Sequence, residues 1–409
     1  MTMELLGLGI LKLEYTRNYN LEVIMPKPKV AHFILDGFCP ANEDNYYDNF
    51  HHLDSIFSSV EEYVVDNPDT GFPRSPDLWT RCYSRKSYSD LSREGDNGYT
   101  GVTTYARRIP SNEFLWNKVV NSGYPSWIYL YGQYYYIAGD NLIDSSDSNK
   151  KLSGVLKMYG GPRTALIDNG EVTRYKSDIS FWGLHEPTAP GNKSYEAIKE
   201  FINSECGGDY KEFMKVAPQY MHDYFKREYL PRIEDNKNLY DKEIFPHIQK
   251  HLSEFENGGY LNLGIIETDP PYHFFPFYED LIQEVRDYVC YIIDNTIKIY
   301  NPDIVIITGD HGMESVYKVF EDKRASDSSG SRKLFSFNYE GKTRQVACAS
   351  FGVAPLFTDH SNKIGGVLFC KDKKYQDIFQ NKYFKTTPYF MYDVYDYISD
   401  LFGKDTSNE

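Results

Sequence analysis

The chain has 409 residues, of which 44 are Lys or Arg and 59 are Asp or Glu, so its formal net charge is −15 at pH 7. An acidic chain is a poor binder of nucleic acid polymers and of anionic membranes, and no apolar run reaches the roughly 18 residues of a membrane-spanning helix. The six cysteines show no zinc-finger spacing, and we expect free thiols in a reducing compartment.

The N-terminal residues 1–24 contain a short apolar run, but Glu4 precedes it, and neither a basic region nor a small-residue cleavage site is present. These residues do not resemble a signal peptide, so we expect a leader of uncertain order and a cytoplasmic protein. At the other end, residues 404–409 are expected to fray.

The predicted elements alternate between buried strands and amphipathic helices. A first strand is expected over 29–38 (KVAHFILDGF) and a second over 123–132, after a helix through 114–120. This helix is preceded by Pro110 and Ser111, which suit the beginning of a helix.

A second strand–helix–strand unit is predicted further along the chain. Strands are expected over 259–269 and 303–310, on either side of a helix over 277–300 whose apolar residues recur at helical spacing. Strands joined in this way are parallel. We therefore predict an α/β protein with a mostly parallel central sheet flanked by helices.

The middle of the chain has a different composition. Residues 145–256 are richer in charge and in helical segments such as SYEAIKEFI. We interpret them as an inserted helical or cap segment, and residues 25–144 and 257–403 as the core that carries the sheet.

Ligand-type side chains follow three of the predicted strands. Asp36 ends the first strand, Asp269 and then His273 follow the third, and Asp310 and His311 end the fourth. A lone Gly-Asp-His-Gly could be a simple turn, but the carboxyl ends of parallel strands meet at one edge of a sheet. Asp and neutral His suit Zn²⁺, and also Mn²⁺ or Fe²⁺. The sequence therefore predicts a metal site at this edge.

A nucleophile is available in the segment SPDLWT, which ends at Thr80. A threonine hydroxyl bound to a metal ion can be activated at neutral pH without a histidine base.

These motifs, in this order, resemble the alkaline phosphatase superfamily, and within it the type I phosphodiesterase/nucleotide pyrophosphatase branch. The resemblance covers about residues 30–403. The matching pieces are FILDGF, SPDLWT, FLWNKVVNSGYPSW, DPPYHFFPFYEDL, GDHGM, FTDHSNKIGGVLF and YFMYDVYDYISDLFG.

The resemblance implies a catalytic core, 25–144 with 257–403, that binds two divalent metal ions, Zn²⁺ or Mn²⁺. One ion would be held by Asp36, Thr80, Asp310 and His311, and the other by Asp269, His273 and His360. Thr80 would attack phosphorus in line, and water would release the phosphothreonine. The implied substrate is a small phosphate ester, such as a diester or a nucleotide-type pyrophosphate. The oligomeric state is left open.

Two features depart from the family pattern. The stretch after Thr80 replaces the Thr-Gly and His-Gly pattern of the family. Trp79, Arg81 and Lys86 are candidates for the groups that contact the phosphate. His360 is followed by more residues before its Gly pair than the pattern has.

Three alternatives stay open. A sulfatase would need a Cys or Ser in C/S-x-P-x-R, and CYSRK at Cys82 lacks the proline and the arginine. A phosphonate hydrolase or a phosphomutase shares the same core. The sequence separates these enzymes poorly, because the cap determines the substrate. The non-enzymatic alternative is a degenerate relative that only binds metal or a partner.

Overall fold

The computed structural model describes residues 27–37, 49–66, 75–91, 108–131, 151–157, 161–181, 193–265, 279–315, 333–339, 342–348, 355–356, 358–360, 363–384 and 390–403. The expected leader (1–24) and the expected frayed end (404–409) lie outside these residues. In the part of the chain that the structure describes, no helix is long and apolar enough to cross a membrane.

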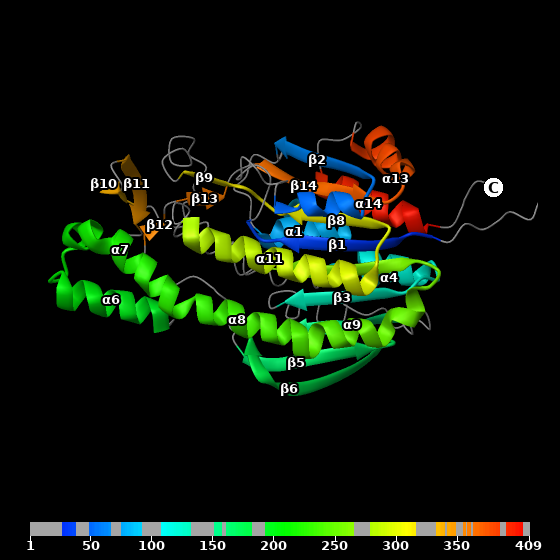
Figure 1. Cartoon of the computed structure of the whole chain (residues 1–409), viewed down its shortest axis with the longest axis horizontal. Coiled ribbons are helices and arrows are strands. Elements are labelled where there is room, and N and C mark those ends of the chain that lie inside the picture. Colours follow the sequence, from blue (N-terminus) through cyan, green and yellow to red (C-terminus); the bar gives the residue numbers. More distant parts are fainter. Residues whose placement is uncertain are drawn as a thin grey trace, which may run out of the picture.

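A nine-stranded sheet forms the centre of the molecule, in the order β2-β14-β8-β1-β7-β3-β4-β5-β6 (Figure 1). Neighbouring strands from β8 through β1, β7 and β3 to β4 pair in parallel, whereas β14 and β5 run antiparallel to their neighbours. The strands are β1 (Lys29–Leu35), β2 (Ser59–Asp66), β3 (Ser126–Tyr131), β4 (Leu152–Lys157), β5 (Gly161–Asp168), β6 (Glu171–Phe181), β7 (Gly259–Ile265), β8 (Ile304–Gly309) and β14 (Lys363–Cys370).

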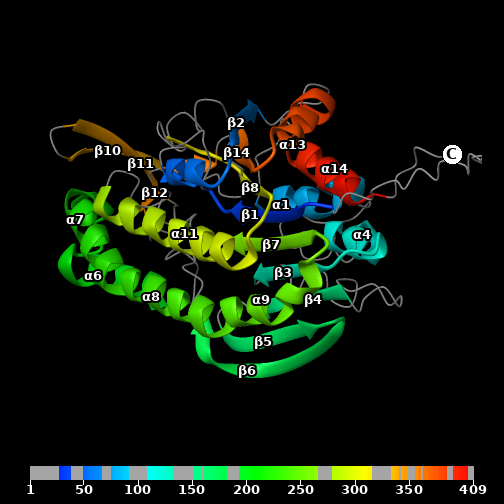
Figure 2. The same ribbon diagram turned by 45° about the vertical axis from the view of Figure 1, so that its right-hand side comes forward.

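Helices cover both faces of this sheet (Figures 1 and 2). One face packs against α6 (Lys193–Glu205), α7 (Tyr210–Glu228), α8 (Leu230–Leu239), α9 (Phe245–His251) and α11 (Glu279–Tyr300). The other face packs against α1 (Ser75–Ser84), α2 (Tyr88–Leu91), α4 (Leu115–Asn121), α13 (Lys373–Ile378) and α14 (Phe390–Phe402). The α/β class with a mostly parallel, helix-flanked sheet is thus confirmed.

Burial on both faces explains why β1 reads as a continuous apolar run. Ala31, Phe33 and Leu35 enter the core under α11, whereas Val30 and Ile34 enter the core under α1. A strand covered on both sides has no solvent face that would require alternate polar residues.

Smaller elements complete the described fold. The short sheets β9–β13 and β10–β11–β12 lie near the end of the molecule where the parallel strands have their carboxyl ends (Figure 1). Their strands are β9 (Met313–Ser315), β10 (Lys333–Tyr339), β11 (Lys342–Cys348), β12 (Pro355–Leu356) and β13 (Thr358–His360). Short 3₁₀ or π turns are η3 (His51–Ser55), η6 (Ser111–Glu113), η9 (Tyr240–Ile244), η10 (Leu252–Phe255) and η11 (Phe379–Phe384).

The four predicted strands are present as β1, β3, β7 and β8, and the two predicted helices as α4 and α11. The helical interpretation of residues 145–256 needs a correction, because β4, β5 and β6 extend the central sheet before the helices begin. The missed signal was the dipeptide Asn169-Gly170, whose φ angles of 50° and 82° turn β5 back into β6. Asn-Gly favours such a turn because both residues tolerate positive φ.

Candidate metal centre

The register between two parallel strands brings Asp36 and Asp310 to the same level. Leu35 of β1 lies opposite Gly309 of β8, and an aspartate follows each of them directly. The backbone N–H of Asp310 donates to the Leu35 carbonyl at 3.3 Å, and that of Asp36 donates to the Ile265 carbonyl at 3.0 Å. Both aspartates therefore stand at the carboxyl edge of the sheet, as the strand rule predicts.

Asp36, Asp310 and His311 form a buried cluster whose ligand atoms all lie within 4.8 Å of one another. Their exposed fractions are 4%, 0% and 0%. His311 Nε2 lies 3.4 Å from Asp36 Oδ1 and 3.6 Å from Asp310 Oδ2. These separations exceed those of an ordinary N–H···O bond, about 2.7–3.2 Å. They match the spacing of about 3.4 Å between two atoms that each lie about 2.1 Å from one tetrahedral cation.

The ring nitrogen of His311 that carries the proton also leaves the other nitrogen available for a cation. Its Nδ1 lies 3.2 Å from the Gly312 carbonyl, which can only accept, so Nδ1 carries the proton. In the neutral ring, Nε2 then directs a lone pair toward the two carboxylates. Three electron-rich atoms that converge in a buried space fit a divalent cation.

Three N–H donors hold the Asp310 carboxylate in one orientation. Its Oδ1 accepts from the backbone N–H groups of Gly37 at 2.9 Å and His311 at 2.8 Å. Its Oδ2 accepts from the indole Nε1–H of Trp79 at 2.9 Å.

Thr80 and its neighbours lie in helix α1, which packs on the face of the sheet that Val30 and Ile34 of β1 enter. The Thr80 side chain is 8% exposed and follows Trp79, whose indole touches the cluster. Arg81 is also buried, with its guanidinium 5.9 Å from the centre of the Tyr392 ring, a cation–π distance. Lys86 forms an ion pair with Glu113 at 3.1 Å.

The remaining predicted ligands are less completely described. Asp269 and His273 lie outside the described residues. His360 ends β13, and its backbone pairs with Met313 of β9, the second residue after His311. This register places the backbone of His360 next to β9, two residues along the chain from His311.

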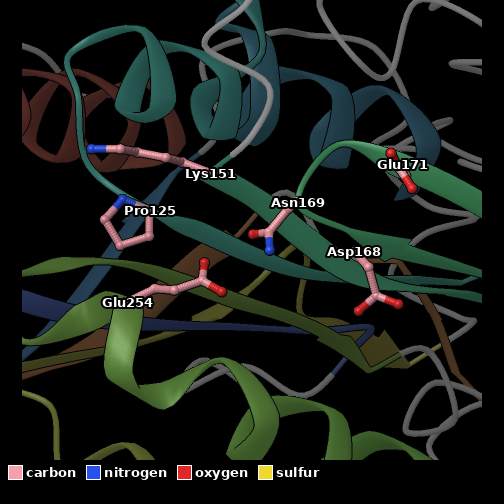
Figure 3. Close-up of a pocket in the computed structure, with 6 residues that line it drawn as sticks. All are labelled: Pro125, Lys151, Asp168, Asn169, Glu171 and Glu254. Atoms are coloured by element: carbon pink, nitrogen blue, oxygen red, sulfur yellow. The ribbon is translucent and has the colours of Figure 1, made fainter.

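A second group of metal-type side chains lies at the opposite edge of the sheet, where the parallel strands have their amino ends. His247 and His251, four residues apart on α9, place Nε2 atoms 3.1 Å and 2.9 Å from Asp168 Oδ1. Lys250 Nζ lies 2.7 Å from the same oxygen. Asp168 and Glu254 line a pocket with a volume of about 750 Å³. Figure 3 shows the residues that line it. The His-x-x-x-His spacing of His247 and His251 in the sequence is the signal that points to this group.

The hydrogen bonds of this second group are those of a proton-linked network, in which N–H groups donate to Asp168, and they do not favour a metal ion. The Trp127 indole N–H donates to His247 Nδ1 at 2.9 Å, so the proton of the neutral His247 ring lies on Nε2 and points toward Asp168. Burial lowers the pKa of His247 to about 4. Burial would raise the pKa of Asp168, but hydrogen bonds from Lys250 and His251 outweigh it and lower that pKa to about 2.

A buried polar layer lies beneath the metal-type cluster, between α1 and the sheet. His32 contacts Thr308 Oγ1 at 2.8 Å and the Tyr260 hydroxyl at 3.1 Å, and burial lowers its pKa to about 3. Cys82 Sγ lies 3.9 Å from His32 Nε2. Burial raises the pKa of the Cys82 thiol, and the negative charge of Asp310 raises it further, so this thiol stays neutral. The cysteines with described side chains, Cys82, Cys206, Cys290 and Cys370, are free thiols, as expected.

Comparisons with known proteins give a likeness in structure only. No protein-family model matches the chain, and no curated protein does. Alkaline phosphatase from the Antarctic bacterium TAB5 aligns with 10% identity and a TM-score of 0.40, over 92% of this chain and 99% of that chain. Phosphonoacetate hydrolase from Sinorhizobium meliloti 1021 aligns with 8% identity and a TM-score of 0.40, over 93% and 97%. Lipoteichoic acid synthase LtaP from Listeria monocytogenes aligns with 11% identity and a TM-score of 0.32, over 81% and 65%.

Likenesses of this kind carry no argument about activity.

Proposed function

We propose that the protein is a metal-dependent hydrolase of small phosphate esters, of the phosphodiesterase or nucleotide pyrophosphatase type. The observation that carries this proposal is the buried cluster of Asp36, Asp310 and His311, in which the His311 Nε2 lone pair faces two carboxylates. A divalent cation bound there supplies positive charge that stabilises a phosphoryl group and lowers the pKa of a bound hydroxyl.

Thr80 is the proposed nucleophile. Its Oγ1 forms a bond to phosphorus while the bond between phosphorus and the leaving ester oxygen breaks, and the hydroxyl proton passes to water. Hydrolysis of the phosphothreonine then restores the threonine. The position of Thr80 directly after Trp79, whose indole touches Asp310, supports this role.

We further propose that Asp269, His273 and His360 hold a second divalent cation, Zn²⁺ or Mn²⁺. The resemblance to the alkaline phosphatase superfamily suggests this set. The pairing of His360 with Met313, close to His311 along the chain, supports one of its three members.

The sulfatase alternative is disfavoured by Cys82. Its side chain is 0% exposed and packed in the core under α1, and its thiol pKa is raised by burial. A thiol that must be converted by a modifying enzyme or attack a substrate needs access and a thiolate.

The first test is the hydrolysis of bis-p-nitrophenyl phosphate with added Zn²⁺ or Mn²⁺. Thr80→Ala should lower kcat by at least about 10³-fold, because it removes the nucleophile, and Thr80→Ser should retain part of it. The matched control is Thr296→Ala in α11, which covers the opposite face of the sheet and where the threonine hydroxyl donates to the Ile292 carbonyl at 2.7 Å. Equal activity of Thr80→Ala and Thr296→Ala would remove Thr80 from the mechanism.

The same proteins should be tested on p-nitrophenyl phosphate, a phosphonate ester and p-nitrophenyl sulfate. Preference for the diester supports the proposal. Preference for the phosphonate would favour a phosphonate hydrolase, and sulfate hydrolysis that Cys82→Ala abolishes but Thr80→Ala does not would favour a sulfatase.

A further inference from the structure

Trp79 directly precedes the proposed nucleophile Thr80 in helix α1, and its side chain contacts a proposed metal ligand, Asp310. The ring is 2% exposed, and its Nε1–H donates to Asp310 Oδ2 at 2.9 Å. We propose that Trp79 is a positioning residue that fixes the Asp310 carboxylate for cation binding and ties the helix that carries Thr80 to the same carboxylate. This inference rests on the proposed function, because it deepens the role of the same site.

The two carboxylate oxygens of Asp310 accept hydrogen bonds from different groups. Oδ1 already accepts two backbone N–H groups, from Gly37 and His311. Oδ2 accepts the Trp79 N–H and lies 3.6 Å from His311 Nε2. The oxygen that points into the cluster is therefore the one that Trp79 holds. An indole N–H can only donate, so it orients this oxygen without competing for the cation.

The surrounding residues keep the Trp79 ring in a single place. A Cβ at Gly264 of β7 would lie 2.5 Å from Trp79 Cζ3, so the absence of a side chain there makes the space for the ring. Tyr83 packs edge-on against the ring, with the centroids 6.2 Å apart, and its hydroxyl donates to Asn262 Oδ1 at 3.1 Å. A side chain held by packing on this scale can fix the geometry of the ligand it touches.

Trp127 provides a matched control within the same chain. It is fully buried, and its indole N–H also donates at 2.9 Å, but to His247 Nδ1 at the opposite edge of the sheet. Replacing either tryptophan by phenylalanine keeps a ring and removes one N–H donor. Only Trp79→Phe removes a donor from a proposed metal ligand.

The experiment is a calorimetric titration of chelator-stripped wild type, Trp79→Phe and Trp127→Phe with Zn²⁺. Trp79→Phe should weaken Zn²⁺ binding by about 10- to 100-fold, the usual loss when the hydrogen-bond partner of a ligand is removed. Its diesterase activity should fall at limiting Zn²⁺ and recover at high Zn²⁺, which a general folding defect would not do. Trp127→Phe should bind Zn²⁺ as the wild type does. Equal affinities of the two variants would overturn the inference.

A second measurement covers the case in which Trp79→Phe does not fold. In ¹H–¹⁵N spectra of the wild type, added Zn²⁺ should move the indole signal of Trp79 more than that of Trp127, and equal movement would overturn the inference.

The proposed function and the positioning role of Trp79 can fail separately. Zn²⁺ binding that depends on Trp79, without hydrolysis of any ester, would overturn the proposed function and support the inference. Hydrolysis that requires Thr80, with Zn²⁺ binding indifferent to Trp79, would do the reverse.

Discussion

His311 Nε2 lies 3.4 Å from Asp36 Oδ1, although the two residues follow different strands. Their contact is a product of register, because Leu35 and Gly309 pair directly at the ends of β1 and β8. A slip of one residue between the strands would turn one of these side chains to the other face of the sheet. The cluster thus exists only in the folded sheet, and its chemistry is coupled to folding.

The first prediction concerns Asp36→Asn. Without a cation, the carboxylates of Asp36 and Asp310 are buried within 4.8 Å of each other, so removing one negative charge should leave the metal-free protein at least as stable as the wild type. With Zn²⁺ at about 100 times its Kd, the wild type should gain about 2.7 kcal/mol in free energy of unfolding, and the variant should gain little. Thermal unfolding with EDTA and with Zn²⁺ measures both effects.

The control for this prediction is Asp294→Asn, a half-exposed carboxylate that pairs with His52 at 2.8 Å. It should respond to Zn²⁺ as the wild type does. A wild type whose unfolding temperature is the same in EDTA and in Zn²⁺, while Zn²⁺ is shown to be bound, would contradict the cluster as the binding site.

The sequence could predict Asp36, Asp310 and His311 as neighbours for a simple reason. Each follows a strand buried on both faces, and the carboxyl ends of parallel strands meet at one edge. The hydrogen bond from Trp79 to Asp310 could not be predicted, because it joins residues 231 positions apart through the packing of α1 on the sheet. Asp269 and His273 remain predictions, since they lie outside the described residues.

The same limit explains the missed strands β4 to β6. These strands contain charged residues, and each is placed in the sheet by pairing with its neighbour: β4 with β3, β5 with β4, and β6 with β5. Lys157 shows the conflict, because it ends β4 with a fully buried side chain whose ammonium lies 2.8 Å from Glu243 Oε2. A buried lysine is stable only with such a partner from another element, which local sequence does not reveal.

The second prediction concerns Gly264→Ala. The new Cβ would meet Trp79 Cζ3 at 2.5 Å and the Tyr83 hydroxyl at 3.2 Å, so the ring or the strand must shift. Overpacking of this kind should lower the free energy of unfolding by about 1–3 kcal/mol. Zn²⁺ affinity should fall as well, because a displaced Trp79 ring no longer orients Asp310. Urea unfolding and calorimetry measure the two effects.

The comparison variant is Gly403→Ala, just after α14, where the nearest atoms lie at 3.4 Å or more from the new Cβ. It should be neutral for both stability and Zn²⁺ binding. If Gly264→Ala behaved as Gly403→Ala does, the Trp79 ring would not be confined in the way the structure shows.

The third prediction concerns pH and rests on two buried histidines. Burial lowers the pKa of His247 from its ordinary value of 6.5 to about 4, and that of His32 to about 3. Below pH 6.5 the unfolded chain therefore binds protons that the folded chain excludes. Their stabilising contribution is present above pH 6.5 and is lost as pH falls, at up to about 1.4 kcal/mol per pH unit for each histidine. The loss due to His247 ends near pH 4, and that due to His32 near pH 3. Asp168, with its pKa lowered to about 2, adds a further loss only at pH values below its ordinary 3.8.

His247→Gln separates these contributions. A glutamine can accept from the Trp127 indole and donate to Asp168, as His247 does, but it does not titrate. In urea unfolding between about pH 7 and pH 5, this variant should lose less stability on acidification than the wild type, with a slope that is shallower by up to about 1.4 kcal/mol per pH unit. An unchanged slope for His247→Gln would mean that the folded protein takes up the proton at His247 as readily as the unfolded chain does, and the hydrogen bond from Trp127 could then not be fixing its neutral form.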